Sequence, residues 1–252
     1  MVDKLFAEPD LAEWYDLFCP WNARDDFPFY LPFIMAAESV LDVGCGTGML
    51  LHRARESGHP GRLCGLDPAP AMLNLARRRS DIEWADGDLS TVSWTDEFDL
   101  VIMTGHAFQT LTTDAEVRSG LAAIHTALKP HGTFAFETRN PLVREWETWT
   151  PENAVEVRNS SGTTMRQTQH VESFEDDLLT FILTYTTPSW PEPKVSRSTL
   201  RFLDVASLSA FLEAAGFTIE DQFGDFSRTP VSSTSPEIVT FASAPKISPP
   251  LG

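Results

Sequence analysis

Short apolar runs alternate with longer amphipathic segments through the first half of the chain. Five runs predict buried strands, at 39–43, 62–66, 82–85, 98–103 and 132–138. Three segments between them carry apolar residues at helical spacing, at 48–57, 69–79 and 114–128. Because strands that alternate with helices build a parallel sheet covered on both faces, this pattern predicts a doubly wound α/β fold.

The segments on either side of this alternation have other patterns. Residues 3–38 favour two short helices around a loop, since apolar side chains recur at helical spacing before and after 19–22. Residues 150–203 contain strand-like runs separated by turn residues such as those at 159–162. They predict an antiparallel β insertion of three or four strands after the fifth strand of the sheet.

The last part of the chain predicts a helix followed by a hairpin. A capped amphipathic segment begins at Asp204 and ends at Gly216, a residue type that readily takes the left-handed conformation. Strand-like runs follow at 218–226 and 237–242. They would close the sheet as a hairpin, with an antiparallel last strand.

Local signals predict three further boundaries. Asp114 stands where an acidic cap would begin the helix at 114–128. Residues 129–132, Lys-Pro-His-Gly, predict the stop and turn after that helix. Residues 245–252 predict a disordered tail.

A glycine-rich turn follows the first predicted strand. Residues 40–48 spell Val-Leu-Asp-Val-Gly-Cys-Gly-Thr-Gly and lead directly into a helical segment. A strand, a glycine turn and a helix let the backbone approach a nucleotide closely, with the helix N-terminus facing it. The G-x-G-x-G spacing differs from the G-x-G-x-x-G of dinucleotide binders and from the P-loop. Alone, the turn is also compatible with a purely structural role.

An acidic residue, Asp67, ends the second predicted strand. A carboxylate at this place can accept hydrogen bonds from both hydroxyls of a ribose. The helix that begins near Pro68 and contains Met72 would line the adenine side of the same nucleotide.

Further short motifs accompany these two features. They are Gly-Leu-Asp-Pro at 65–68, Gly-Asp-Leu at 87–89, Phe-Asp-Leu-Val-Ile-Met at 98–103 and Ala-Leu-Lys-Pro-His-Gly-Thr at 127–133. Together with the glycine turn, and in this order, they resemble the class I S-adenosylmethionine-dependent methyltransferases. The resemblance covers roughly residues 38–140. It implies a mostly parallel, seven-stranded Rossmann-like sheet that binds S-adenosyl-L-methionine.

The resemblance also suggests how the chain is organised. We interpret residues 1–252 as a single methyltransferase domain with five parts. They are an N-terminal helical lid (1–38), a cofactor-binding core (39–140), the antiparallel insertion (150–203), the closing helix and hairpin (204–244) and the tail (245–252). We expect the insertion to provide substrate or dimer contacts.

Individual cofactor contacts follow from the same resemblance. Gly44, Gly46 and Asp67 would hold the methionine and ribose parts, and Asp88 with the Leu89 amide would hold the adenine. An ordinary Asp-Gly-Asp turn is the alternative explanation for Asp88, and Asp86 is the competitor for the same role. The expected cofactor-binding residues are Tyr15, Asp42, Gly44, Cys45, Gly46, Gly48, Asp67, Pro68, Met72, Asp88, Leu89, Thr104 and Gly105.

His106 is the candidate catalytic residue. It follows the fourth strand, in a loop that should border the transferred methyl group, and imidazole can take a proton near neutral pH. Two alternatives remain open: it positions the loop, or it binds substrate without proton transfer. Many members of the family need no base.

Substrate contacts are expected from Trp21, His106, Phe108, Arg139 and Trp146. Arg139 could bind a substrate carboxylate through its planar fork, or pair with a neighbouring acid. Trp146 could wall a pocket or fill the core. The lid aromatics Tyr15 and Trp21 could touch cofactor or substrate, or pack the lid onto the sheet.

Charge and cysteine content exclude several functions. The net charge is −17, from 36 acidic and 19 basic side chains, which would repel a nucleic acid. The apolar runs are too short to span a membrane, and the first residues do not have the pattern of a secretion signal. The three cysteines are widely spaced, so we expect neither a disulfide framework nor a metal site. We predict a cytoplasmic protein, monomer or homodimer.

The sequence therefore predicts methyl transfer from S-adenosyl-L-methionine to an N or O atom of a small molecule. One alternative is an enzyme of the same fold that uses this cofactor for other chemistry or retains it structurally. A less favoured alternative is an NAD-dependent oxidoreductase. The acceptor atom is not encoded in a motif: the Asn/Asp-Pro-Pro-Tyr/Phe signature is absent, and no His-Asp/Glu constellation is evident.

Overall fold

A seven-stranded sheet forms the centre of the computed structural model, which describes residues 3–245. Its strand order is β10-β11-β5-β4-β1-β2-β3. The strands are β1 (Ser39–Val43), β2 (Arg62–Asp67), β3 (Glu83–Asp86), β4 (Phe98–Met103), β5 (Leu128–Arg139), β10 (Thr218–Phe223) and β11 (Glu237–Ser243). The first five are parallel to one another, whereas β11 is antiparallel to both β5 and β10. The predicted doubly wound sheet and its antiparallel last strand are confirmed.

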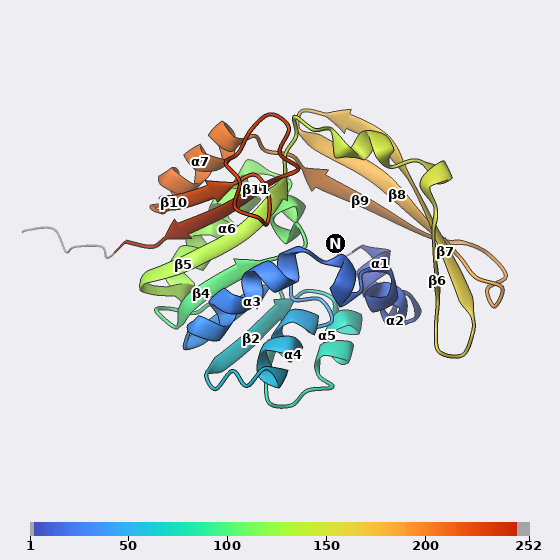
Figure 1. Cartoon of the computed structure of the whole chain (residues 1–252), viewed down its shortest axis with the longest axis horizontal. Helices are drawn as coiled ribbons and strands as arrows, with labels where there is room; N and C mark the ends of the chain where they lie inside the picture. The colour runs from blue at the N-terminus through green and yellow to red at the C-terminus, as the bar shows by residue number, and fades with distance from the viewer. Residues whose placement is uncertain (1–2, 246–252) are drawn as a thin grey trace, which may run out of the picture.

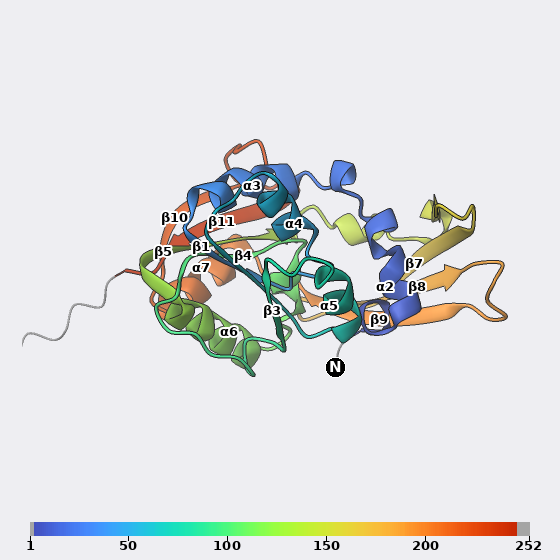
Figure 2. The same cartoon turned by 90° about the horizontal axis from the view of Figure 1, so that it is seen from below.

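Helices cover both faces of this sheet (Figures 1 and 2). They are α3 (Asp26–Ala36) and α4 (Met49–Glu56) on one face, and α6 (Asp114–Ala127) and α7 (Val205–Ala214) on the other. Alternate strand residues face opposite layers: Leu41 packs toward α6 and α7, and Val40 packs toward α3 and α4. Because the central strands are apolar on both sides, they are buried throughout, as a parallel sheet requires.

A second, antiparallel sheet lies beside the first and contains the insertion (Figure 1). Its order is β6-β7-β8-β9. The strands are β6 (Val155–Arg158), β7 (Thr164–Glu175), β8 (Leu178–Thr186) and β9 (Lys194–Arg201). The N-terminal helices α1 (Lys4–Ala7) and α2 (Pro9–Phe18) contact this sheet and also α5 (Pro70–Ala76). Leu5 and Leu11 share a core cluster with Leu183 of β8.

Three local expectations differ from the structure. Residues 3–38 form three α-helices and a 3-10 turn at Trp21–Ala23, instead of two helices. Thr113, not Asp114, caps α6: its hydroxyl accepts from the Glu116 N–H, and the Glu116 carboxylate accepts from the Thr113 N–H, so this capping box satisfies two N-terminal donors. β5 begins at Leu128, directly after α6. Residues 129–132, where the sequence predicts a turn, instead belong to β5 and lie at a shift in the register between β5 and β4.

Of the remaining expectations, the C-terminal helix can be checked against the structure, whereas the division into parts and the tail cannot. The helix with Asp204 at its cap and Gly216 after its end is confirmed, since Gly216 has a φ of 89°. The five-part organisation and the lid stay predictions. The predicted disordered tail lies outside the described residues from 246 onward. Between residues 3 and 245, no helix combines the length and the apolar character that a membrane crossing requires.

Candidate active site

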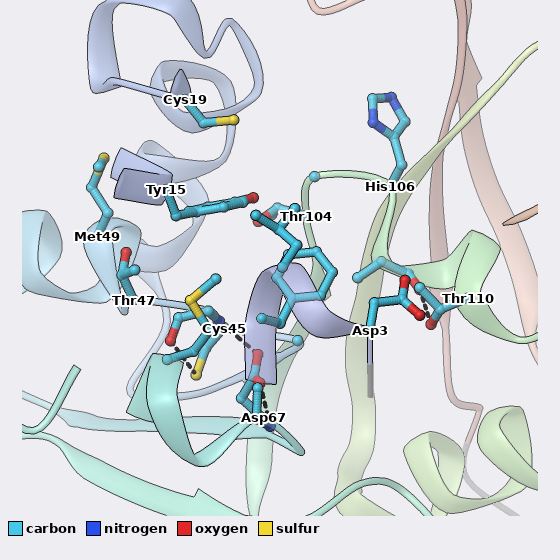
Figure 3. A pocket seen from close by; sticks show the side chains of 18 of the residues that line it. Asp3, Tyr15, Cys19, Cys45, Thr47, Met49, Asp67, Thr104, His106 and Thr110 are labelled. Carbon is cyan, nitrogen blue, oxygen red and sulfur yellow. Dashed lines mark hydrogen bonds between the residues drawn. The ribbon is translucent and has the colours of Figure 1, made fainter. Parts of the chain in front are cut away.

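A cavity of about 340 Å³ lies where the carboxyl ends of the parallel strands meet the N-terminal helices and the second sheet. Its walls come from three parts of the chain: the glycine turn after β1, the loop after β4, and apolar side chains of β8 and β9. Figure 3 shows Tyr15, Cys45 and Asp67 around it. Ligands of open α/β sheets bind at this edge because the loops there are free to approach them.

The glycine turn is bent onto β2 by its own backbone. The N–H groups of Gly44 and Cys45 donate to the Leu66 carbonyl, at 2.8 and 3.1 Å. Gly46 and Gly48 both have positive φ, 56° and 76°, where a side chain is strained. A Cβ on Gly48 would lie 2.4 Å from the Trp84 ring, whereas one on Gly46 would meet nothing within 4 Å. Gly46 therefore opens onto the cavity, and Gly48 serves packing.

Asp67 joins the glycine turn to the next strand. Its two carboxylate oxygens accept from the N–H groups of Gly46 and Ala69, each at 2.8 Å. Burial raises the pKa of Asp67, and these two donors oppose the shift. The side chain is held by backbone, so its position in the cavity wall is fixed before any ligand binds.

Asp42 lines the same wall and lacks a partner. Its side chain is 2% exposed, and its Oδ1 has no hydrogen-bond partner within the described chain. Burial, with the nearby charge of Asp67, raises the pKa of Asp42 to about 8. A buried carboxyl without a donor is costly, so this group suits a ligand that brings one.

A second cavity, of about 530 Å³, adjoins the first. Gly44 and Pro68 line both, and Asp88 with Leu89 line only the second. The Asp88 Oδ1 accepts from the N–H and hydroxyl of Ser90, at 2.9 and 2.6 Å, and this lowers the pKa of Asp88. Asp88, two residues after the end of β3, is therefore an ionised acceptor at the cavity wall.

The N-terminal segment supplies wall residues that sequence reasoning missed. Asp16 accepts from the Thr47 hydroxyl at 2.7 Å and so ties α2 to the glycine turn. Arg24 also lines the cavity, where it donates to Asp26 at 2.8 Å and lies against Gly105. No motif marks these residues, because only the packing of the N-terminal segment against the glycine turn brings them to the cavity.

His106 is held by two carboxyls from different strands. Its backbone N–H donates to Oε1 of Glu137 at 3.0 Å, which stabilises a left-handed φ of 62°. Its Nε2 lies 3.0 Å from Oε2 of Glu237 on β11. Burial, with the charge of Arg139, lowers the pKa of His106 well below its usual value. A His-Glu constellation is thus present, although Glu237 lies far from His106 in the sequence.

The five expected substrate residues do not all reach the cavity. His106 and Arg139 line it, with the His106 ring directed away from Asp67 (Figure 3). Phe108 is buried and stacks on Phe136, Trp146 is buried and stacks on Phe174, and Trp21 packs on Phe27. None of these three lines either cavity. Arg139 donates to Glu145 and Gln109, so it does pair with a neighbouring acid.

The expected cofactor residues gather closely. Ten of them line the first cavity: Tyr15, Asp42, Gly44, Cys45, Gly46, Asp67, Pro68, Met72, Thr104 and Gly105. Asp88 and Leu89 line the second, and Gly48 lines neither. Their contacts with a cofactor stay predictions, but the fold brings twelve of the thirteen to one continuous space.

Comparison with known proteins accounts for this arrangement. Residues 40–132 match the family model of a methyltransferase domain. Residues 40–132, which carry the glycine turn and Asp67, therefore form a methyltransferase domain of the class I S-adenosylmethionine-dependent type. The solved structure of S-adenosylmethionine-bound CalS10, an amino pentose methyltransferase from Micromonospora echinaspora, aligns at 25% identity and a TM-score of 0.65, over 88% of this chain and 91% of that one. The DesVI structure of Streptomyces venezuelae aligns at 23% identity and a TM-score of 0.68, over 93% and 98%.

Curated relatives match this methyltransferase over shorter stretches. A malonyl-[acyl-carrier protein] O-methyltransferase of Hahella chejuensis is 30% identical over 40% of this chain and 36% of its own length. A dTDP-3-amino-3,6-dideoxy-alpha-D-glucopyranose N,N-dimethyltransferase of Streptomyces fradiae is 31% identical over 53% and 51%. The chain thus spans only about a third to a half of these two relatives.

The site of this methyltransferase fits the cofactor of its family. S-adenosyl-L-methionine carries an ammonium, a ribose and an adenine, which need acceptors, and a carboxylate, which needs a donor. Asp42 has a free buried oxygen, Asp67 stands at the turn, and Gly46 leaves space where a side chain would intrude. Arg24 provides a cation in the same wall. The predicted family and its cofactor are confirmed at this level.

Proposed function

We propose that this protein transfers a methyl group from S-adenosyl-L-methionine to an N or O atom of a small molecule. The observation that carries the proposal is the shared cavity, which the glycine turn and Asp67 line together with His106 and Arg139. The second sheet covers this cavity with Phe181 and other apolar residues, which favours a compact acceptor. The strongly negative net charge disfavours nucleic acid.

The chain would act by alignment and by excluding water. Asp67 would hold the ribose hydroxyls, Asp42 the ammonium, and Asp88 with the Leu89 amide the adenine. When bound, the cofactor supplies a methyl group on a sulfonium sulfur, open to attack by a lone pair in line with the breaking bond. Thr104 and Gly105 would then border the acceptor.

Calorimetric titration tests the cofactor half of the proposal. We expect S-adenosyl-L-methionine to bind and NAD not to bind. In Asp67→Ala, loss of the charge-assisted ribose contacts should weaken binding about 100-fold, equivalent to about 3 kcal/mol. Asp221→Ala, exposed on β10 at the far edge of the sheet, is the matched control and should bind as the unaltered chain does. Binding indifferent to Asp67, or equal binding of NAD, would contradict the assignment.

A product assay separates transfer from a structural use of the cofactor. Purified protein with S-adenosyl-L-methionine and a panel of small acceptors should form S-adenosylhomocysteine, measured by mass spectrometry, only when an acceptor is added. Tight cofactor binding without product across the panel would favour the same-fold alternative. The prediction of a monomer or homodimer is measured separately, by light scattering.

A further inference from the structure

Around His106, carboxyl groups outnumber the Lys and Arg side chains that could pair with them. Arg24 donates through two nitrogens to Asp26, and Arg139 donates to Glu145. These two pairs use both cations of the cluster. Glu137 and Glu237, the two carboxyls that touch His106, have no Lys or Arg partner among the described residues.

The two carboxyls lie behind the cavity wall. In the register of β5 and β11, Glu237 pairs with Arg139 and Glu137 pairs with Val239. Val239 belongs to the core cluster under α3, so this face of the two strands is the one that α3 covers. His106 and Arg139 line the cavity, whereas neither carboxyl does.

Glu137 is also incompletely bonded. Its side chain is 0% exposed, Oε1 accepts from the His106 N–H, and Oε2 makes no hydrogen bond of standard geometry in the part of the chain that the structure describes, although the buried Tyr30 hydroxyl lies beside this carboxyl. Burial and the charge of Asp26 raise the pKa of Glu137 to about 8. Below that pH the Glu137 carboxyl is mostly neutral, and a cation brought close to it would favour its ionised form.

We propose that the methyl acceptor is an amine, which enters as an ammonium ion attracted by Glu137 and Glu237 and gives its proton to the His106–Glu237 pair. This inference rests on the methyl transfer proposed above. It narrows the acceptor from nitrogen or oxygen to a basic nitrogen. The apolar residues Phe181, Leu183 and Leu200 of the second sheet would hold the carbon skeleton.

In the proposed transfer, the proton, the methyl group and each electron pair have a stated destination. The ammonium N–H bond breaks and its proton passes to the His106–Glu237 pair, which leaves a lone pair on nitrogen. That lone pair forms the N–C bond to the methyl group while the S–C bond breaks, and its electron pair stays on sulfur. The product is a methylated ammonium and a neutral thioether, and the pair later returns its proton to water.

Carboxylate and hydroxyl acceptors fit the charged groups around His106 less well than an amine does. A carboxylate acceptor would add another anion to a cluster that already lacks cations. An aliphatic hydroxyl acceptor gives up its proton only far above neutral pH, much as water does, whereas an alkylammonium resembles a Lys side chain, with a pKa of about 10. Burial raises the pKa of Glu237 to about 8, and its pair with His106 can accept the proton of an ammonium but not that of an alcohol.

Groups from every neighbouring element face His106. They are Glu137 and Arg139 of β5, Glu237 of β11, Asp26 of α3, the neutral Tyr30 hydroxyl of α3, Arg24 of the preceding loop and Glu145 of the segment after β5. With Arg24 and Arg139 paired, the described residues around His106 present no unpaired Lys or Arg to a bound ammonium.

A matched acceptor panel tests the inference. Propyl, cyclohexyl and benzyl skeletons are each supplied as amine, alcohol and carboxylate, at millimolar concentration with S-adenosyl-L-methionine. We expect S-adenosylhomocysteine to form at least tenfold faster with amines than with their oxygen counterparts. Equal rates for the three head groups, or no product from any amine, would overturn the inference. Calorimetry with S-adenosyl-L-methionine on the same sample shows separately whether the cofactor binds and the proposed function survives.

Two variants test the His106–Glu237 pair itself. Glu237→Gln keeps the shape and a hydrogen bond to His106 but cannot hold the proton. It should lower the amine-dependent rate at pH 7.5 at least tenfold, leave cofactor affinity unchanged, and move the rise of the rate with pH upward from about pH 8. Glu220→Gln on the adjacent β10 is exposed and should change neither quantity. An unshifted pH profile in Glu237→Gln would show a purely structural contact.

Discussion

The two halves of the cavity are built in different ways. The cofactor half comes mainly from residues 42–89, in three consecutive strand ends, and depends on backbone N–H groups and short carboxylates. The acceptor half combines residues as distant as Arg24, His106 and Glu237, through side chains packed between α3, β5 and β11. Local chain geometry determines the first half, and long-range packing determines the second.

This difference has an energetic counterpart. In the cofactor half, backbone donors compensate the buried carboxylate of Asp67, and among the carboxyls described there only Asp42, whose pKa is raised to about 8, lacks a donor. In the acceptor half, two carboxyls whose pKa values are raised to about 8 remain without a cation. We therefore expect the first half to be pre-organised and stable, and the second to be destabilising until a ligand binds.

The largest effect is expected at Gly48. An Ala there takes a φ of 76° and places its Cβ 2.4 Å from the Trp84 ring. Backbone strain and overpacking together should lower the free energy of unfolding by about 2–5 kcal/mol, measured by urea denaturation. An unchanged denaturation midpoint would show that the Trp84 ring moves aside freely. The glycine turn would then not be rigid, and the cofactor half would not be pre-organised.

Gly46→Ala is the counterpart within the same turn. Its Cβ would meet nothing within 4 Å, so only the strain of a φ of 56° remains, about 1–2 kcal/mol of stability. The new methyl group would occupy cofactor space, and calorimetry should show affinity at least tenfold weaker. If Gly46→Ala destabilised the fold as much as Gly48→Ala and bound normally, the two glycines would have the opposite roles.

Glu137→Gln tests whether a buried carboxyl destabilises the acceptor half. The pKa of Glu137 is raised from 4.5 to about 8, so between these values the unfolded chain releases a proton that the folded protein keeps. Stability therefore falls as pH rises from about 4.5 to 8, and Gln removes this loss. At pH 8 the variant should be more stable by about 1–3 kcal/mol, with a flatter dependence of Tm on pH in calorimetry.

The control for that change is Glu213→Gln, on the exposed side of α7. It should leave the pH dependence of Tm unaltered. A lower Tm for Glu137→Gln at pH 8 would mean that the carboxylate stabilises the ligand-free fold, against the comparison drawn above.

Thr113→Ala should have the smallest effect. It should alter neither the cofactor half nor the acceptor half of the cavity. It removes the hydroxyl that caps α6, at a cost of about 1 kcal/mol in unfolding free energy. Cofactor affinity should stay within twofold, as calorimetry can verify. A larger loss of affinity would show that the order of α6 is coupled to the second cavity, which Glu116 also lines.

The sequence by itself determined the main sheet, its antiparallel closing strand and the positions of the glycine turn, Asp67 and Asp88. These depend on period-2 and helical patterns and on turns whose geometry is set by neighbouring residues. The cofactor contacts stay predictions, but their residues could be named because consecutive parallel strands end at one edge.

Only the tertiary structure decided the acceptor half. Nothing local pairs His106 with Glu237, and the contact exists because β11 lies antiparallel beside β5. The same packing buries Phe108 and Trp146, which the sequence alone could not distinguish from pocket residues, since an aromatic side chain serves either place equally well. Arg24 and Asp16 reach the cavity only because the N-terminal helices fold over the glycine turn, a long-range packing event that no short motif encodes.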